Sequence, residues 1–209
     1  MLAPAALTCA LALYNHFPLT YSDSGNYLEN AIDILHGHRP WFFFRPPTYG
    51  VVLLPFATRL TLWLLPFAQG LLVAGVVDLT LRCAAVVLSP RALAALFAVL
   101  TVATSLSWFS GQITPDVFTP VVILLSFVVV WAPVPGWRRL WPACAVLGVA
   151  IATHLSHFPL YGVLLVGGLA ARLATDPGAL RCRWCCARRP RLLSLSRWSS
   201  RRTGSATAG

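Results

Sequence analysis

Long runs of apolar residues, separated by short polar loops, make up most of the first 175 residues. A bilayer core requires about 20 apolar residues in one helix. Six runs approach this length: residues 2–19, 60–81, 93–109, 117–132, 140–153 and 158–173. The last two fit either two tilted helices or one kinked pair broken at residues 154–159. The pattern predicts an all-α fold, a polytopic transmembrane helix bundle of about six spans.

The polar segment between the first two runs, residues 20–48, contains a shorter periodic pattern. Four apolar residues recur there at helical spacing: Tyr27, Ala31, Ile32 and Leu35. Glu29 and Asp33 lie on the opposite side. This predicts an amphipathic helix at the membrane surface that ends at Gly37. An aromatic run, residues 41–44, follows Arg39 and suits the membrane interface.

The composition agrees with a membrane protein and divides the chain in two. Hydrophobic residues make up 57% of the chain and charged residues 11%, which excludes an ordinary soluble domain. Residues 1–175 carry eight Arg and five acids, whereas residues 176–209 carry eight Arg and one acid. The net charge of +10 is therefore concentrated in the tail, which argues against a nucleic-acid partner. We expect a transmembrane helical domain over residues 1–175 and a basic, disordered tail over residues 176–209.

The tail mixes Arg, Cys, Trp and Ser without helical or strand periodicity. This pattern favours a GC-rich gene read out of frame over the alternative of a juxtamembrane segment that binds anionic lipid. We therefore expect the chain to be an N-terminal fragment that is inactive in this truncated form.

Arginine placement predicts how the helices are threaded. Cytoplasmic loops carry an excess of Lys and Arg. Loops with arginine alternate here with loops that carry acids, and the arginines are Arg82, Arg91, Arg138, Arg139 and Arg172. Threading with these loops inside places the N-terminus in the cytoplasm. It places three loops on the outer face, residues 20–48, 110–116 and 154–157.

Asp23, immediately beyond the first apolar run, is the first candidate for chemistry. Its alternative role is to cap the surface helix. The surrounding string is DSGNYLENAIDILHGHRPWFFFRPPTYG. Its order of Asp23, Tyr27, Gly37 and Arg45-Pro-Pro-x-Tyr resembles the first extracytoplasmic loop of integral-membrane glycosyltransferases of the GT-C class. That class includes protein O-mannosyltransferases and enzymes that add aminoarabinose or galacturonic acid to lipid A.

The resemblance implies a multi-pass protein of a bacterial inner membrane that transfers sugar from a polyprenyl-phosphate donor to an acceptor hydroxyl. Asp23 would be the catalytic base, because a carboxylate partly removed from water is a stronger base. Tyr27 would contact substrate. The departing phosphate requires a cation, for which Arg45 is the first choice and Arg39 the second. The alternative for both arginines is interfacial anchoring.

Two further outer loops carry polar candidates for substrate binding. Asp116 follows Thr114 and Pro115, which suit the N-cap and first residue of a helix, so Asp116 either contributes to the site or complements the helix dipole. His154 and His157 are three residues apart and can share a helical face. With Asp116 they would contact phosphate or hold a divalent ion, although three ligands are too few to name a metal. The alternative is that both histidines are buried and hydrogen-bonded.

A non-enzymatic polytopic protein, such as a small transporter or an assembly subunit, is the competing function. Transporters place polar residues near the bilayer midplane. Here the spans are almost free of charge, apart from Asp78, which has Arg82 one turn away. The lipid bilayer and a polyprenyl-linked sugar are therefore the expected partners, with no required cofactor other than the divalent ion considered above.

Overall fold

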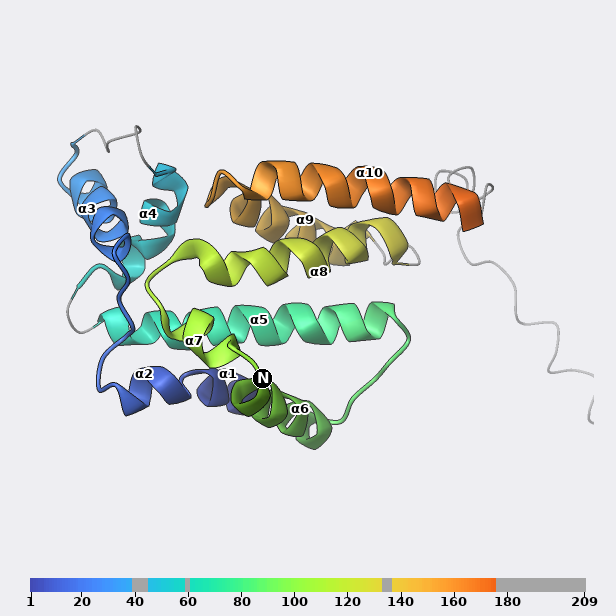
Figure 1. Cartoon of the computed structure of the whole chain (residues 1–209), viewed down its shortest axis with the longest axis horizontal. Helices are drawn as coiled ribbons and strands as arrows, with labels where there is room; N and C mark the ends of the chain where they lie inside the picture. The colour runs from blue at the N-terminus through green and yellow to red at the C-terminus, as the bar shows by residue number, and fades with distance from the viewer. Residues whose placement is uncertain (39–44, 59–60, 133–136, 176–209) are drawn as a thin grey trace, which may run out of the picture. The chain divides into compact units, whose positions relative to one another are not determined.

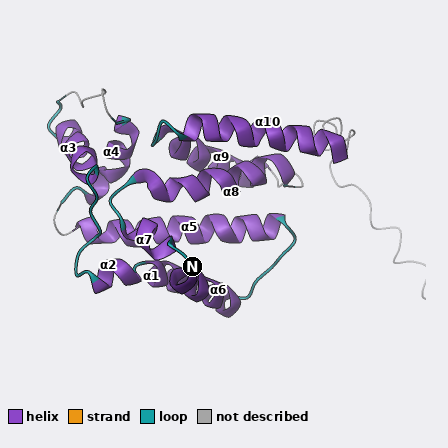
Figure 2. Ribbon diagram, viewed as in Figure 1, coloured by secondary structure: helices purple, strands orange, loops and turns teal. Residues whose placement is uncertain are grey.

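The computed structural model describes residues 1–38, 45–58, 61–132 and 137–175. The chain divides into two compact units, Met1–Ala171 and Arg172–Gly209. In the second unit, the described residues are the last four of a helix that begins in the first. The described residues form helices and loops, with a single isolated β-bridge and no strand (Figure 2). The predicted all-α class is confirmed.

Ten α-helices and three short 3₁₀ helices are described (Figure 1). In chain order they are α1 (Leu2–Thr8), α2 (Ala10–Tyr14), α3 (Ser24–Leu35), α4 (Pro47–Leu53), η1 (Leu54–Phe56), η2 (Thr61–Trp63), α5 (Leu64–Cys83), α6 (Pro90–Ala103), α7 (Leu106–Gly111), η3 (Pro115–Val117), α8 (Phe118–Trp131), α9 (Trp137–Ala152) and α10 (His157–Thr175).

Two of the described helices are long and apolar enough to cross a membrane, Thr61–Cys83 and His157–Thr175. Four other apolar helices are shorter, between 10 and 17 residues: Pro47–Phe56, Pro90–Ala103, Pro115–Trp131 and Leu140–Ala152. The six-span count is therefore not confirmed. The break predicted at residues 154–159 lies at residues 153–156, between α9 and α10.

Two predicted spans, residues 2–19 and 93–109, are wrong as continuous helices. The first is divided at Cys9 and ends before His16, whose φ is +56°. The second is divided at Thr104, which is extended. These breaks are stabilised by each other, because the Ser107 hydroxyl donates to Thr8 O (3.0 Å). The Ser110 hydroxyl shares its proton between Leu106 O (2.7 Å) and Thr8 O (3.1 Å). Backbone groups freed by a helix break require such partners away from water.

The helix α5 packs against α1, α7 and α8. Gly70 permits the approach of α1, since a Cβ at this position would lie 2.1 Å from Thr8 Oγ1 and 3.0 Å from Ala5 O. Small residues of this kind allow close helix packing in membranes. At the end of α5, Arg82 Nε donates to Asp78 Oδ2 at 2.7 Å, so the predicted i,i+4 pair is confirmed.

The helix α3 packs against α4, at the end of the bundle where α8 and α10 begin (Figure 1). Gly37, at φ +73°, ends α3 as predicted, and His38 N donates to Asp33 O (2.8 Å) in the pattern of a Schellman cap. On this helix Tyr27, Ala31 and the polar Asn30 are buried in the protein, whereas Ile32 and Leu35 are exposed.

Candidate functional site

Residues from three loops that are distant in sequence come together at one end of the helices. Asp23 directly precedes α3, Asp116 lies in η3, and His154 lies between α9 and α10. An isolated bridge joins the first two loops, since Leu19 N donates to Gly111 O (2.8 Å) and Ile113 N donates to Leu19 O (2.9 Å). These loops are the three that arginine placement assigned to the outer face.

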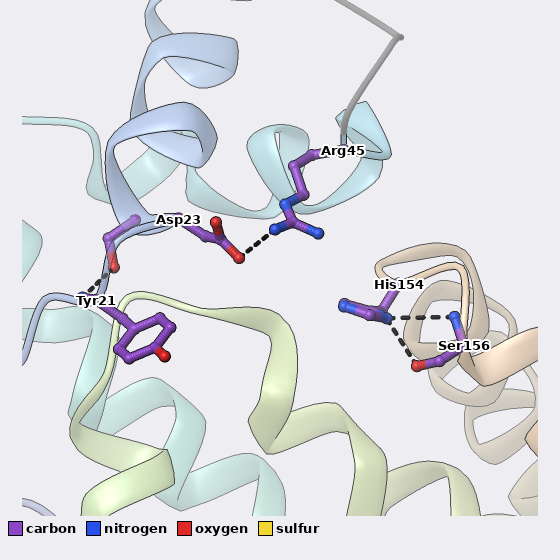
Figure 3. A network of polar contacts seen from close by, with 6 residues as sticks. Tyr21, Asp23, Arg45, His154 and Ser156 are labelled. Carbon is purple, nitrogen blue, oxygen red and sulfur yellow. Dashed lines mark hydrogen bonds and ion pairs between the residues drawn. The ribbon is translucent and has the colours of Figure 1, made fainter.

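Asp23 forms an ion pair with Arg45 (Figure 3). Both side chains are about one-third exposed, at 33% and 31%. Arg45 is held in place by Pro46, which is extended, and by Pro47, which begins α4. The hydrogen bond that Arg45 donates to Asp23 raises the pKa of the Arg45 guanidinium, an effect that burial opposes.

The carboxylate of Asp23 does not cap α3. Asp23 occupies the N-cap position, but its backbone is helical and its side chain accepts no hydrogen bond from the helix. Ser24 Oγ accepts instead from Tyr21 N (2.8 Å), while Ser24 N donates to Tyr21 O (3.0 Å). The helix start is therefore stabilised without Asp23, and the carboxylate is directed to Arg45. This geometry removes the capping alternative for Asp23.

One of the donors of Arg45 is both buried and unused. Its Nε is buried and has no hydrogen-bond partner among the described residues. An unsatisfied buried donor costs about 1–3 kcal/mol. The other predicted arginine, Arg39, lies outside the described residues.

Tyr27 lies beside the ion pair as part of an aromatic stack. Its ring meets Tyr49 edge to face, with centroids 5.0 Å apart, and Tyr49 meets Phe118 at 6.1 Å. The pKa of Tyr27 is raised to about 12, mainly by burial; Arg45 lowers it, whereas Asp23 and Asp116 contribute to the increase. The Tyr27 phenol therefore stays protonated near neutral pH.

The buried amide of Gln69, on α5, is hydrogen-bonded to Tyr49 of this stack. Sequence reasoning did not assign it a role. With its carbonyl oxygen toward Tyr49, Gln69 accepts from the Tyr49 hydroxyl (3.0 Å) and donates to Ser110 O (2.7 Å) and Gln112 O (3.2 Å). A lone amide within a long apolar helix is a signal that could have identified it, because polar groups in such helices are costly.

Asp116 lies in the first turn of η3, as predicted. Thr114 occupies the N-cap position, but its hydroxyl donates to Gln112 Oε1 (3.2 Å) rather than capping the helix. Asp116 interacts electrostatically with Tyr27, Arg45 and His157. Asp116 therefore contributes negative charge to the region around the Asp23–Arg45 ion pair.

The two predicted histidines are near each other, with ring centroids 5.5 Å apart. His157 is buried, whereas His154 is partly exposed beside Ser156. Within the described part of the chain, no three His, Cys, Asp or Glu side chains gather closely enough to hold a metal ion. The divalent ion considered from sequence thus has no assembled ligand set there.

An apolar cavity of about 350 Å³ adjoins the aromatic stack. Residues of α4, η1, α5, α8 and α9 line it: Val52, Phe56, Leu65, Ala68, Gln69, Leu72, Phe118, Ala145, Val146 and Val149. Phe118 and Gln69 belong both to this lining and to the contacts of Tyr49. Tyr49 therefore contacts two residues of the cavity lining and also Tyr27, which lies beside the Asp23–Arg45 ion pair.

Comparisons with protein-family models, curated proteins and solved structures gave no match to this chain.

Proposed function

We propose that the chain carries the donor-binding site of a membrane glycosyltransferase of the GT-C type, in a multi-pass protein of a bacterial inner membrane. It would take a polyprenyl-phosphate sugar and an acceptor hydroxyl on the extracytoplasmic side. The observation that carries the proposal is the Asp23–Arg45 ion pair. It combines a carboxylate not used for helix capping with a guanidinium that has an unsatisfied donor.

The proposed chemistry uses both partners of the pair. The acceptor oxygen attacks the anomeric carbon and its proton passes to the Asp23 carboxylate. The bond between that carbon and the phosphate oxygen breaks, and the lipid phosphate leaves with the electron pair. Arg45 stabilises that phosphate, because a guanidinium binds two oxygens at once. Arg45 therefore exchanges Asp23 for phosphate when the donor arrives, which leaves the carboxylate available as a base.

The apolar cavity supports a lipid-linked donor. A ligand whose phosphate meets Arg45 needs somewhere apolar for its hydrocarbon chain, and the chamber behind Phe118 is lined almost entirely by apolar side chains. Burying each CH₂ group there contributes about 0.8 kcal/mol. Thr61–Cys83 and His157–Thr175 are long and apolar enough to cross a membrane, which agrees with delivery of such a donor from the bilayer.

Substituting each member of the ion pair tests the proposal. The purified 209-residue chain in nanodiscs would be titrated with geranyl phosphate. We expect Arg45→Gln to weaken binding about ten-fold or more, because it removes a charge-assisted contact. Asp23→Asn should preserve or strengthen binding, because it frees Arg45 and removes a negative charge. Transfer is measured in membranes that carry a frame-restored version of the gene and a lipid-linked sugar, where Asp23→Asn should lower it by about a hundred- to ten-thousand-fold.

Asp33→Asn is the matched control, since Asp33 is an acid of the same helix whose partner is His38 (3.7 Å). It should change neither binding nor transfer. A purely structural ion pair would give a different result. Both pair variants would then lose stability equally, with geranyl phosphate binding unchanged per folded molecule. That outcome would overturn the proposal.

A further inference from the structure

The two histidines carry their protons on different nitrogens. His157 Nδ1 lies 2.7 Å from Ala150 O, and because a carbonyl only accepts, Nδ1 must carry the proton. Its Nε2 then accepts from the Thr119 hydroxyl at 3.0 Å. Both ring nitrogens of His157 are thus occupied within the protein. His157 joins α8 to α9 and has no donor left for a ligand.

His154 has the opposite arrangement. Its Nδ1 accepts from the peptide N–H of Ser156 (3.2 Å), and the Ser156 hydroxyl lies 2.7 Å from the same atom. A peptide N–H always donates, so the neutral ring carries its proton on Nε2. This assignment follows from the chemistry of the partner and needs no observed hydrogen atom.

The donor nitrogen of His154 faces the ion pair. In Figure 3 the His154 ring points toward Arg45 and Asp23, with the bonded nitrogen turned back to Ser156. No hydrogen bond involves Nε2 among the described residues. The Arg45 guanidinium lies on the other side of this space (Figure 3), on a side chain that is 31% exposed.

We propose that His154 is a second phosphate contact, which donates its Nε2–H to a phosphate oxygen across from Arg45. This inference rests on the proposed function and assigns its anion subsite. A phosphate monoester offers several acceptor oxygens, which a cation on one side and a neutral donor on the other can share. The nearby charges of Asp23 and Asp116 oppose anion binding, so a second donor strengthens a site that Arg45 alone would hold weakly.

Two substitutions at the same position separate the ring nitrogens. Gln places its amide nitrogen near the position of Nε2, whereas Asn places its amide near Nδ1. His154→Gln therefore keeps the proposed donor, and His154→Asn keeps only the contact with Ser156. We expect geranyl phosphate binding to weaken about ten- to a hundred-fold in His154→Asn, the effect of losing a hydrogen bond to a charged group. It should stay within about three-fold of wild type in His154→Gln.

His157 provides the matched control. His157→Asn keeps a donor for Ala150 O, and should lower thermal stability without changing the affinity of the folded protein for geranyl phosphate. Inorganic phosphate is the second probe. Weaker binding of both probes to His154→Asn than to the wild-type chain supports the contact. If the wild-type chain binds geranyl phosphate more tightly than inorganic phosphate, the ligand is a lipid phosphate. Equal affinities for the two probes identify free phosphate. Equal weakening in both His154 variants, or no weakening in either, would overturn the inference.

The two proposals can fail separately. If Asp23→Asn abolishes sugar transfer but His154→Asn binds geranyl phosphate as wild type does, the function stands and the His154 contact is wrong. If phosphate binding depends on His154 while Asp23→Asn retains transfer, the contact stands and the role of Asp23 is wrong. Absence of binding by the wild-type chain to either probe would overturn both.

Discussion

Replacing Tyr49 with Phe tests whether the buried amide of Gln69 supports the candidate site. Tyr49 is completely buried, and Gln69 is 4% exposed. The substitution retains the ring, so the edge-to-face contacts with Tyr27 and Phe118 survive. It removes only the hydroxyl, which leaves the Gln69 carbonyl oxygen without its partner at 3.0 Å. A buried polar atom left unsatisfied costs about 1–3 kcal/mol, so we expect Tyr49→Phe to destabilise the protein by that amount.

The expected cost is larger for Gln69→Leu. That change orphans the Tyr49 hydroxyl together with Ser110 O and Gln112 O, and should cost about 3 kcal/mol or more. The double variant should be less destabilised than the sum of the two single variants, because once Gln69 is gone the hydroxyl has nothing to bind. A coupling energy of about 1–2 kcal/mol is expected.

The assay is unfolding of the purified chain in detergent, followed by tryptophan fluorescence against temperature or denaturant. Tyr21→Phe is the control, because Tyr21 is 63% exposed and its loss should stay within about 0.5 kcal/mol. If Tyr49→Phe were as neutral as Tyr21→Phe, or if the two single effects simply added, Gln69 would not be bound to Tyr49 and the reasoning would be refuted.

Two further predictions concern Tyr27 and the orientation of the outer loops. The pKa of Tyr27 is raised from 10.0 to about 12, so its contribution to stability is complete below pH 10 and is lost as the pH rises toward 12. Tyr27→Phe should therefore flatten the alkaline part of a stability-against-pH curve, and an unchanged curve together with an ordinary tyrosinate titration would contradict this. In a variant lacking the six native cysteines, a cysteine at exposed Asn26 should react with an impermeant thiol reagent in intact cells. A cysteine at Val87, which is 72% exposed near Arg82 and Arg91, should react only after the cells are opened, and the reverse pattern would show that the orientation is wrong.

Local chain chemistry was enough to predict several features of this protein. The all-helical class follows from long apolar runs, since only helices satisfy their own backbone over such lengths. The end of α3 at Gly37 follows from the ease with which glycine adopts positive φ. The Asp78–Arg82 pair follows from i,i+4 spacing alone. Asp23 and Arg45 were predicted as site residues because the sequence around them resembles a family motif. Their residue types suggested a base and a phosphate ligand.

Other features depended on contacts between segments far apart in the chain. The breaks in the first and third apolar runs could not be predicted from hydropathy, because Ser107 and Ser110 stabilise a break that lies about 100 residues earlier. Asn30 is buried in place of Ile32 since α3 packs on α4 at Gly50, where Asn30 Cβ lies 3.0 Å from the position of a Cβ. Sequence also could not choose between capping and ion pairing for Asp23, or tell His154 from His157. Both choices depend on which partner the fold brings within hydrogen-bonding distance: Arg45 for Asp23, Ser156 for one ring, and Ala150 with Thr119 for the other.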